Sequence, residues 1–457
     1  MFLRRFWSAL EGDRSKGVRA GLGAGLTAAA AIALLSGFQS ADVGGDLAVS
    51  GFGLPDETAT VRVDTFREQY PQVNLELTEG AFDQQQFLTA VASGNVPDVV
   101  YLSRDDLSTY ATRGAIMPLD ACVEEQAIDV GQYREAALQQ VTVEDQLYGI
   151  PEFYNVIALI LADAAFEEAG LSAEAVDTSD WEALAGTSEQ LTRRDGGKLT
   201  RIGFDPKLPE FFPLWVRANG GQFLSDDGKT ASLNSPEAVE ALTYTAGLHE
   251  PAGGRQEFVA FRDTWDFFGA ENQIATDQLA AFPMEQWYLN VLAEVSPEVG
   301  ITVKAFTDRQ GEPLTFATGS AWVVPRGAKN PDAACAFMKT MTDPETWLVA
   351  AQARAKTRAA EGLPFAGVYT ANRVADEKIF SEVYQAGGNP AFDKAVEVVL
   401  GVQDAAFAIP ANPAGAEFRQ AWTDAVNRVL NGEQDAQAAL EQAQAEAQTA
   451  LDDAWNR

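Results

Sequence analysis

The chain has 457 residues, of which 66 are acidic and 33 basic, so its formal net charge is −33. This length is too great for one hydrophobic core and suits two lobes of roughly 150 to 200 residues each. The acidity argues against binding to nucleic acid or to an anionic membrane surface, because both would repel the chain.

The first 38 residues have the layout of an export signal. Arg4, Arg5, Arg14, Lys16 and Arg19 precede an uncharged, alanine-rich run over 20–38. The run also approaches the length of about 20 residues that spans a bilayer, so an uncleaved membrane anchor is the alternative to a cleaved signal. We favour cleavage and expect an exported protein in the periplasm or at the cell surface, with 39–46 as a tether.

Lipid attachment can be excluded at the end of this segment. Leu34-Leu35-Ser36-Gly37 resembles the start of a lipoprotein cleavage box, but Phe38 stands where the box requires a cysteine.

The folded part begins with two alternations of strand and helix. Apolar spacing predicts strands over 47–50 and 73–77 and helices over 58–70 and 83–92. This βαβα order predicts a mainly parallel sheet with covering helices, and therefore an α/β fold.

The segment 94–120 continues the pattern and ends in polar residues. A strand over 99–102 is apolar throughout, which is typical of burial on both faces. Asp105 or Asp106 could cap the helix that follows, and Gly114 would end it in a left-handed conformation. Ligands bind at the carboxyl ends of strands in open α/β sheets, so these acids are either ligand contacts or only helix caps.

The rest of the chain alternates between helices and short apolar runs. We expect a run over 156–161 that crosses between lobes, helices over 181–193 and 235–249, buried strands over 279–282 and 320–324, and two C-terminal helices over 416–455 separated at Asn431-Gly432.

Cysteine and histidine are scarce. Cys122 and Cys335 could form one long-range disulfide, but the apolar run around Cys335 favours two free, buried thiols. His249 lies at a predicted helix end, where we expect a surface residue rather than a catalyst. The sequence has no Cys/His metal cluster, no phosphate-binding Gly-Lys-Ser/Thr loop and no Gly-x-Ser-x-Gly elbow, so we expect no metal, no cofactor and no enzyme activity.

Several short segments, taken in order, resemble the bacterial extracellular solute-binding proteins of carbohydrate ABC importers, the group that includes maltose-binding protein. They are GNVPDVV (94–100), GAIMPLD (114–120), LYGIP (147–151), NGGQF (219–223), NSPE (234–237), LAAF (279–282) with Trp287, GSAW (319–322) and AKNPDAA (328–334).

The resemblance implies a two-lobed periplasmic-binding-protein type II fold. Each lobe would hold a mainly parallel sheet with flanking helices, and hinge segments would let the lobes close over a sugar. The first lobe would comprise 47–154 and 281–325, and the second 155–280 and 326–457. The chain would act as a monomer that delivers a small carbohydrate to the transmembrane subunits of an ABC permease.

Two other functions stay open. A secreted glycosidase would need two carboxyl groups about 5 to 9.5 Å apart, which the many acids could supply. The bound solute could also be a polyol, a peptide or another polar molecule.

A sugar site needs polar side chains for hydroxyl groups and aromatic rings for the C–H faces of the sugar. The resemblance makes Trp287 with Tyr288 the strongest candidates. Glu152 and Tyr154 follow at the first expected crossing, where hinge packing is an equal alternative. The other candidates lie at strand ends or hinges: Phe52, Gln85, Arg104, Asp105, Glu285 and Trp322.

Overall fold

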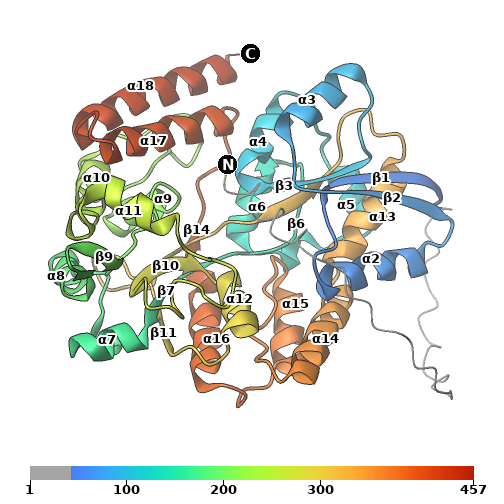
Figure 1. The fold of residues 1–457 in the computed structure, drawn as a ribbon. Coiled ribbons are helices and arrows are strands. Elements are labelled where there is room, and N and C mark those ends of the chain that lie inside the picture. Colours follow the sequence, from blue (N-terminus) through green and yellow to red (C-terminus); the bar gives the residue numbers. More distant parts are fainter. Residues whose placement is uncertain (1–42, 457) are drawn as a thin grey trace.

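The computed structural model describes residues 43–456, which form two lobes of helices packed around sheets (Figure 1). The predicted export segment and the first residues of the tether lie outside this range. Within it, none of the helices combines the length and apolar character needed to span a membrane.

The first lobe is built on a five-stranded sheet in the order β2-β1-β3-β13-β6. These strands are β1 (Gly45–Phe52), β2 (Val73–Glu79), β3 (Val99–Ser103), β6 (Ile150–Pro151) and β13 (Ser320–Val323). The pairs β1–β2 and β1–β3 are parallel, as predicted, because helices connect these strands. β13 is antiparallel to β3 and β6, because the chain returns from the second lobe and enters this sheet from the end at which β3 and β6 finish.

Helices of the first lobe start at the predicted positions, with one correction. Asp56 caps α2 (Glu57–Gln69) by accepting a hydrogen bond from the Ala59 amide at 2.9 Å. For α4 (Arg104–Thr112) the cap is Ser103, whose hydroxyl accepts from the Asp105 amide at 3.3 Å, so the predicted Asp105 or Asp106 cap is wrong. Gly114 has the predicted left-handed conformation, with φ of 65°. The remaining helices of this lobe are α3 (Gln84–Ser93), α5 (Asp120–Glu125), α6 (Glu135–Val141), α13 (Pro331–Thr342), α14 (Pro344–Glu361) and α15 (Arg373–Lys378).

The second lobe contains a three-stranded sheet in the order β10-β7-β11. The apolar run over 156–161 was expected to cross between the lobes, but it forms β7 (Ile157–Ala162), the central strand of this sheet, and all six residues of β7 are buried. β10 (Ala281–Glu285) and β11 (Ile301–Ala305) both pair with β7 in antiparallel fashion. The predicted parallel pairing is wrong here, because β7 leaves the hinge whereas β10 and β11 run back toward it.

These pairings differ from the predicted lobe boundaries. β10 and β11 belong to the second-lobe sheet, although 281–325 was expected in the first lobe. Conversely, α13 and α14 pack on α2 of the first lobe. The carboxylate of Asp98, beside β3, holds the start of α13 by accepting hydrogen bonds from the amides of Lys329 at 2.7 Å and Asn330 at 2.9 Å.

Helices surround the second-lobe sheet, and the predicted C-terminal pair is confirmed. α17 and α18 are separated at Asn431-Gly432, and Phe418, Trp422 and Val426 of α17 are buried. The helices are α7 (Asp163–Ala169), α8 (Trp181–Leu191), α9 (Phe212–Ala218), α10 (Pro236–Gly247), α11 (Gly254–Arg262), α12 (Trp287–Val295), α16 (Pro390–Val402), α17 (Gly415–Leu430) and α18 (Ala436–Trp455). The short strands outside the two main sheets are β4 (Thr142–Val143), β5 (Gln146–Leu147), β8 (Arg193–Asp195), β9 (Lys198–Arg201), β12 (Thr315–Phe316) and β14 (Ala406–Phe407).

Three extended segments lie side by side at the junction of the lobes and are here called the crossing strands: 153–156 and 315–319, which connect the lobes, and 405–408, which connects α16 with α17 of the second lobe. Asn155 forms an isolated bridge with Thr318, and β12 pairs with β14 in parallel. Gln286, which follows β10, fixes the first crossing strand by accepting from the Val156 amide at 2.6 Å and donating to the Tyr154 carbonyl at 3.1 Å.

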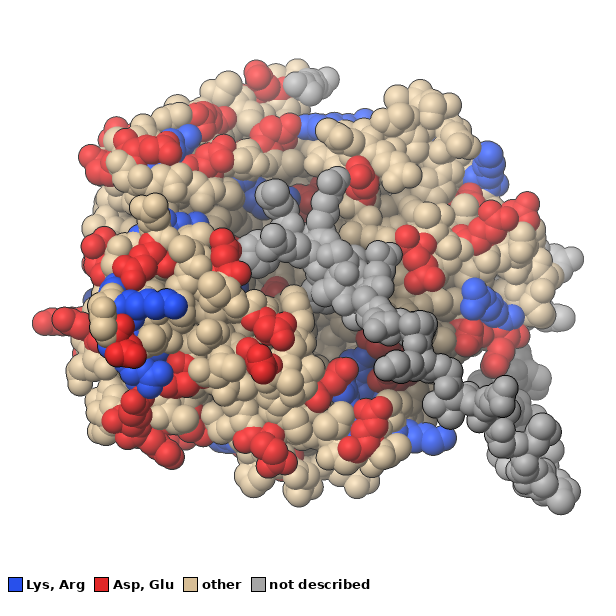
Figure 2. Space-filling view, viewed as in Figure 1, with Lys and Arg blue, Asp and Glu red and all other residues tan. Residues whose placement is uncertain are grey.

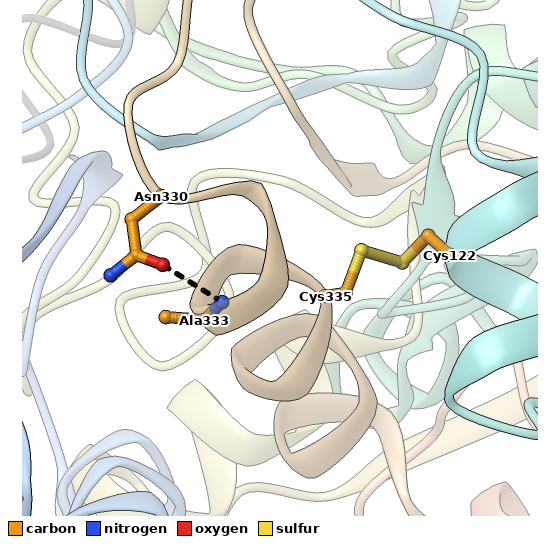
Figure 3. The surroundings of a disulfide bond; sticks show 4 residues. All are labelled: Cys122, Asn330, Ala333 and Cys335. Atoms are coloured by element: carbon orange, nitrogen blue, oxygen red, sulfur yellow. Dashed lines mark hydrogen bonds between the residues drawn. A yellow bond between two sulfur atoms is a disulfide. The ribbon is translucent and has the colours of Figure 1, made fainter. Parts of the chain in front are cut away.

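Two sequence expectations fail inside the lobes. Cys122 of α5 and Cys335 of α13 form a disulfide with a Cα–Cα distance of 5.6 Å, so the preference for free thiols is wrong (Figure 3). The apolar face of α13 does bury Cys335, but this face lies against α5. His249 is 1% exposed rather than on the surface, because its ring packs on Phe258 with centroids 4.1 Å apart.

Candidate functional site between the lobes

Two main-sheet strands, one from each lobe, end beside the crossing strands. β3 ends at Ser103, with Asp105 next but one, and β10 ends at Glu285, with Trp287 next but one. The carboxyl ends of β3 and β10 therefore bring polar and aromatic side chains to the junction of the lobes, which is where α/β proteins bind ligands. Acidic side chains are also spread over the visible face of both lobes (Figure 2).

Trp287 and Glu285 form the second-lobe side of this site. The indole N–H of Trp287 donates to Oε2 of Glu285 at 2.5 Å, and the Thr318 hydroxyl donates to Oε1. The Trp287 ring is nearly parallel to that of Phe268, with centroids 6.2 Å apart and an interplanar angle of 16°. Phe268 is 36% exposed. Together these groups present an aromatic surface next to a carboxylate held in a fixed orientation.

Asp105 forms the first-lobe side. Its Oδ1 accepts from the amide of Gln140 at 2.8 Å. Burial raises the pKa of Asp105; Arg419 opposes this shift, whereas the negative charges of Asp106 and Glu285 add to it.

An ion pair joins the lobes beside these carboxylates. Arg419 of α17, in the second lobe, lies 2.6 Å from Asp106 of α4, in the first. A second pair, Arg113 with Glu417, joins the same two helices.

Arg104 has a different role from the predicted one. It is 1% exposed and donates to Gln140 Oε1 at 2.8 Å and to the carbonyls of Phe153 and Thr318, each at 2.5 Å. The side chain thus holds two crossing strands together. Burial and these bonds occupy the guanidinium, so nothing in this arrangement supports the predicted direct contact of Arg104 with a ligand.

Three other residues predicted to contact a ligand, Glu152, Trp322 and Phe52, have side chains in the interior of the first lobe. Glu152 is 1% exposed and pairs with Arg62 at 2.9 Å, and burial raises the pKa of Glu152. Trp322 is fully buried, and its ring lies 5.0 Å from that of Phe52. Arg62 also lies over the ring of Trp347, 3.9 Å from its centroid.

The remaining predicted residues are Tyr288, Gln85 and Tyr154. Tyr288 packs on Trp287 with ring centroids 5.9 Å apart, but it is fully buried in the second lobe, where its hydroxyl donates to the Phe267 carbonyl at 3.0 Å. Gln85 is exposed at the start of α3, on a shallow groove along that helix. Tyr154 is 1% exposed and borders a separate cavity behind the crossing strands.

Sequence reasoning missed Phe268, Thr318 and Arg419. Phe268 had a signal, since the aromatic run from Trp265 to Phe268 directly precedes Gly269 in a loop. No sequence signal pointed to Thr318 or Arg419, because their positions follow from the pairing of the crossing strands and from the docking of α17. Among residues 43–456, no group of three His, Cys, Asp or Glu side chains is arranged to hold a metal ion.

The sequence model of the bacterial extracellular solute-binding proteins matches residues 62–360 of the chain. An arabinooligosaccharide-binding protein of Halalkalibacterium halodurans is 24% identical over 251 residues, which are 52% of this chain and 52% of that protein. The chain therefore spans about half the length of this curated relative.

Solved structures extend the similarity to most of the chain. CpMnBP1 with mannobiose bound has a TM-score of 0.71 at 21% identity, over 88% of this chain and 99% of that one. Maltose-bound MalE3 of T. maritima has a TM-score of 0.67 at 17% identity, over 89% and 100%. At these identities the likeness shows the two-lobed fold alone. Since the family match covers more than half of the sequence, the chain belongs to the bacterial extracellular solute-binding protein family.

Proposed function

We propose that the chain is the exported substrate-binding component of an ABC importer, which binds a carbohydrate reversibly between its lobes and delivers it to a membrane permease. The observation that carries this proposal is the group of Trp287, Phe268 and Glu285 at the end of β10, with Asp105 beyond the end of β3 in the other lobe. The aromatic rings suit the C–H faces of a sugar ring, and the carboxylates accept hydrogen bonds from its hydroxyl groups.

The relatives support the same class of ligand. Their names record an arabinooligosaccharide, mannobiose and maltose, all of which are short saccharides. The two lobes supply different groups to the site, so a ligand between them would contact both and stabilise their closed arrangement.

Calorimetric titration of Trp287→Ala tests the site. A thermal-shift screen of arabinotriose, mannobiose, maltose and simple polyols would first identify a ligand. We expect Trp287→Ala to weaken its binding at least tenfold, about 1.4 kcal/mol, because the stacking surface is lost. Trp455→Ala is the matched control, since Trp455 lies on α18 and donates to the Gly228 carbonyl, away from the site. Equal affinity of wild type and Trp287→Ala would refute the site assignment.

The carboxylates of Asp105 and Glu285 at the junction of the lobes keep a glycosidase as the alternative function. Incubation of the protein with the sugar that it binds, followed by chromatography of the products, separates the two functions. An intact sugar is expected for a transport protein, whereas cleavage that Glu285→Gln abolishes would establish the enzyme.

A further inference from the structure

The crossing strands border a cavity that the proposed transport site does not use. Its volume is about 530 Å³, within the usual range for sites that bind small molecules. It lies between α6 of the first lobe, the third crossing strand with the residues around it, and the second-lobe segment formed by α9 and 221–226. Both lobes therefore contribute to its walls.

This cavity and the Trp287 group lie on opposite faces of the first crossing strand. Tyr154 borders the cavity, whereas the side chain of the next residue, Asn155, accepts a hydrogen bond from Gln286 at 3.4 Å on the side of β10. Successive side chains of an extended strand point to opposite faces. A molecule in the cavity would thus be separated from one at Trp287 by the strand itself.

The lining is chemically mixed and balanced in charge. Phe407 and the neighbouring alanines supply a partly exposed apolar surface, and the Arg217 guanidinium lies 5.8 Å from the centre of the Phe407 ring. The exposed amides of Gln139 and Gln222 face the cavity from different lobes. Three arginines and three acidic residues complete the wall, so it carries no net charge in a chain whose formal net charge is −33.

Balanced charge disfavours an ion as the occupant, because a cation or an anion would meet as many like charges as opposite ones. Amides, carboxylates and guanidinium groups around an apolar surface match a neutral molecule with many hydroxyl groups. We infer that the cavity is a second binding site, for a neutral saccharide of one or two rings, at the rear of the crossing strands. This site is independent of the transport site at Trp287.

Titration of Trp287→Ala separates the rear site from the front one, because this change weakens the front site alone and the cavity variants below act on the rear site alone. The probes are mannobiose and maltose, each titrated separately at millimolar concentration. We expect Trp287→Ala to keep one binding event per chain with at least one probe. The double variant Trp287→Ala with Ala408→Trp places an indole in the cavity and should lose that binding event. The double variant Trp287→Ala with Ala445→Trp, on the exposed face of α18, should keep it unchanged.

A second variant distinguishes a loss of binding from a failure to fold. Adding Gln139→Ala with Gln222→Ala removes two exposed amides without adding bulk, and we expect at least a tenfold loss of the remaining affinity. The inference is wrong if Trp287→Ala binds neither probe, or if both cavity variants bind as Trp287→Ala does. The transport site is judged separately, by the difference between wild type and Trp287→Ala.

Discussion

Arg62 compensates a carboxylate that is buried inside the first lobe. Arg62 and Glu152 lie 2.9 Å apart, with side chains 1% and 0% exposed. Removing one partner of a buried pair leaves the other charge without compensation, which costs about 3 to 5 kcal/mol. We expect Arg62→Met to lower the free energy of unfolding by this amount in urea titrations.

Arg67→Met provides the control for this prediction. Arg67 pairs with Asp64 on the same helix at 3.0 Å, but both side chains are about half exposed. Exposed pairs contribute about 1 kcal/mol or less, so this variant should unfold close to the wild type. Equal losses for Arg62→Met and Arg67→Met would contradict the role of the buried pair.

His249 makes stability depend on pH. Burial is the main cause that lowers its pKa to about 4 from the usual 6.5, and Arg255 and Arg262 lower it further against the opposing effect of Asp205. As the pH falls below 6.5, His249 of the unfolded chain binds a proton, whereas His249 of the folded chain binds it only near pH 4. Stability of up to about 3 kcal/mol is present above pH 6.5 and is lost across this window.

Replacement of His249 tests this pH dependence. Urea unfolding at a series of pH values should show a smaller decline between pH 6.5 and 4 for His249→Leu than for the wild type, because leucine cannot titrate. Parallel declines would show that His249 does not carry this part of the pH dependence.

At the residue scale, the sequence identified Trp287 and Glu285 but not which neighbours share their surface. Trp322 shows why. Ala321, Trp322 and Val323 are all buried, so alternation along β13 does not reveal which side faces a ligand. Glu152 shows another limit, since its partner Arg62 lies 90 positions earlier and only the fold brings the two together.

At the scale of elements, the disulfide joins two helices that are far apart in the sequence. Cys122 and Cys335 are separated by 213 residues. A cross-link that closes so long a loop restricts the unfolded chain and stabilises the folded one by about 5 kcal/mol. We expect the double variant Cys122→Ala with Cys335→Ala to lose about this much stability in urea.

Reduction distinguishes the cross-link from the packing of the cysteines. Dithiothreitol should lower the unfolding midpoint of the wild type and leave that of the double variant unchanged. A wild type that responds to dithiothreitol no more than the variant would show that the bond contributes nothing.

Element positions were more predictable than element partners. Apolar spacing located α2 and the C-terminal pair α17 and α18, because this signal is local. The sheet to which β10 belongs was missed, since a short buried strand looks the same in either lobe. Pairing depends on where the chain returns, and no local pattern records that.

At the scale of the whole molecule, the two-lobed fold followed from the order of several weak motifs, and the structure explains one of them. Asp98 in GNVPDVV binds the backbone at the start of AKNPDAA through Lys329 and Asn330. Two motifs more than 200 positions apart therefore meet at one carboxylate. The division into lobes was less predictable, because it depends on where each strand pairs.

The place of β13 in the sheet has a consequence for the biogenesis of this protein. β13 lies between β3 and β6, but residues 104–319 separate it from β3 in the chain. Ribosomes add about 5 to 20 residues per second, so about 10 to 40 seconds pass between the synthesis of β3 and that of β13. During that time β3 and β6 lack the strand that joins them. The order of the strands thus keeps the first-lobe sheet incomplete until most of the chain has been made.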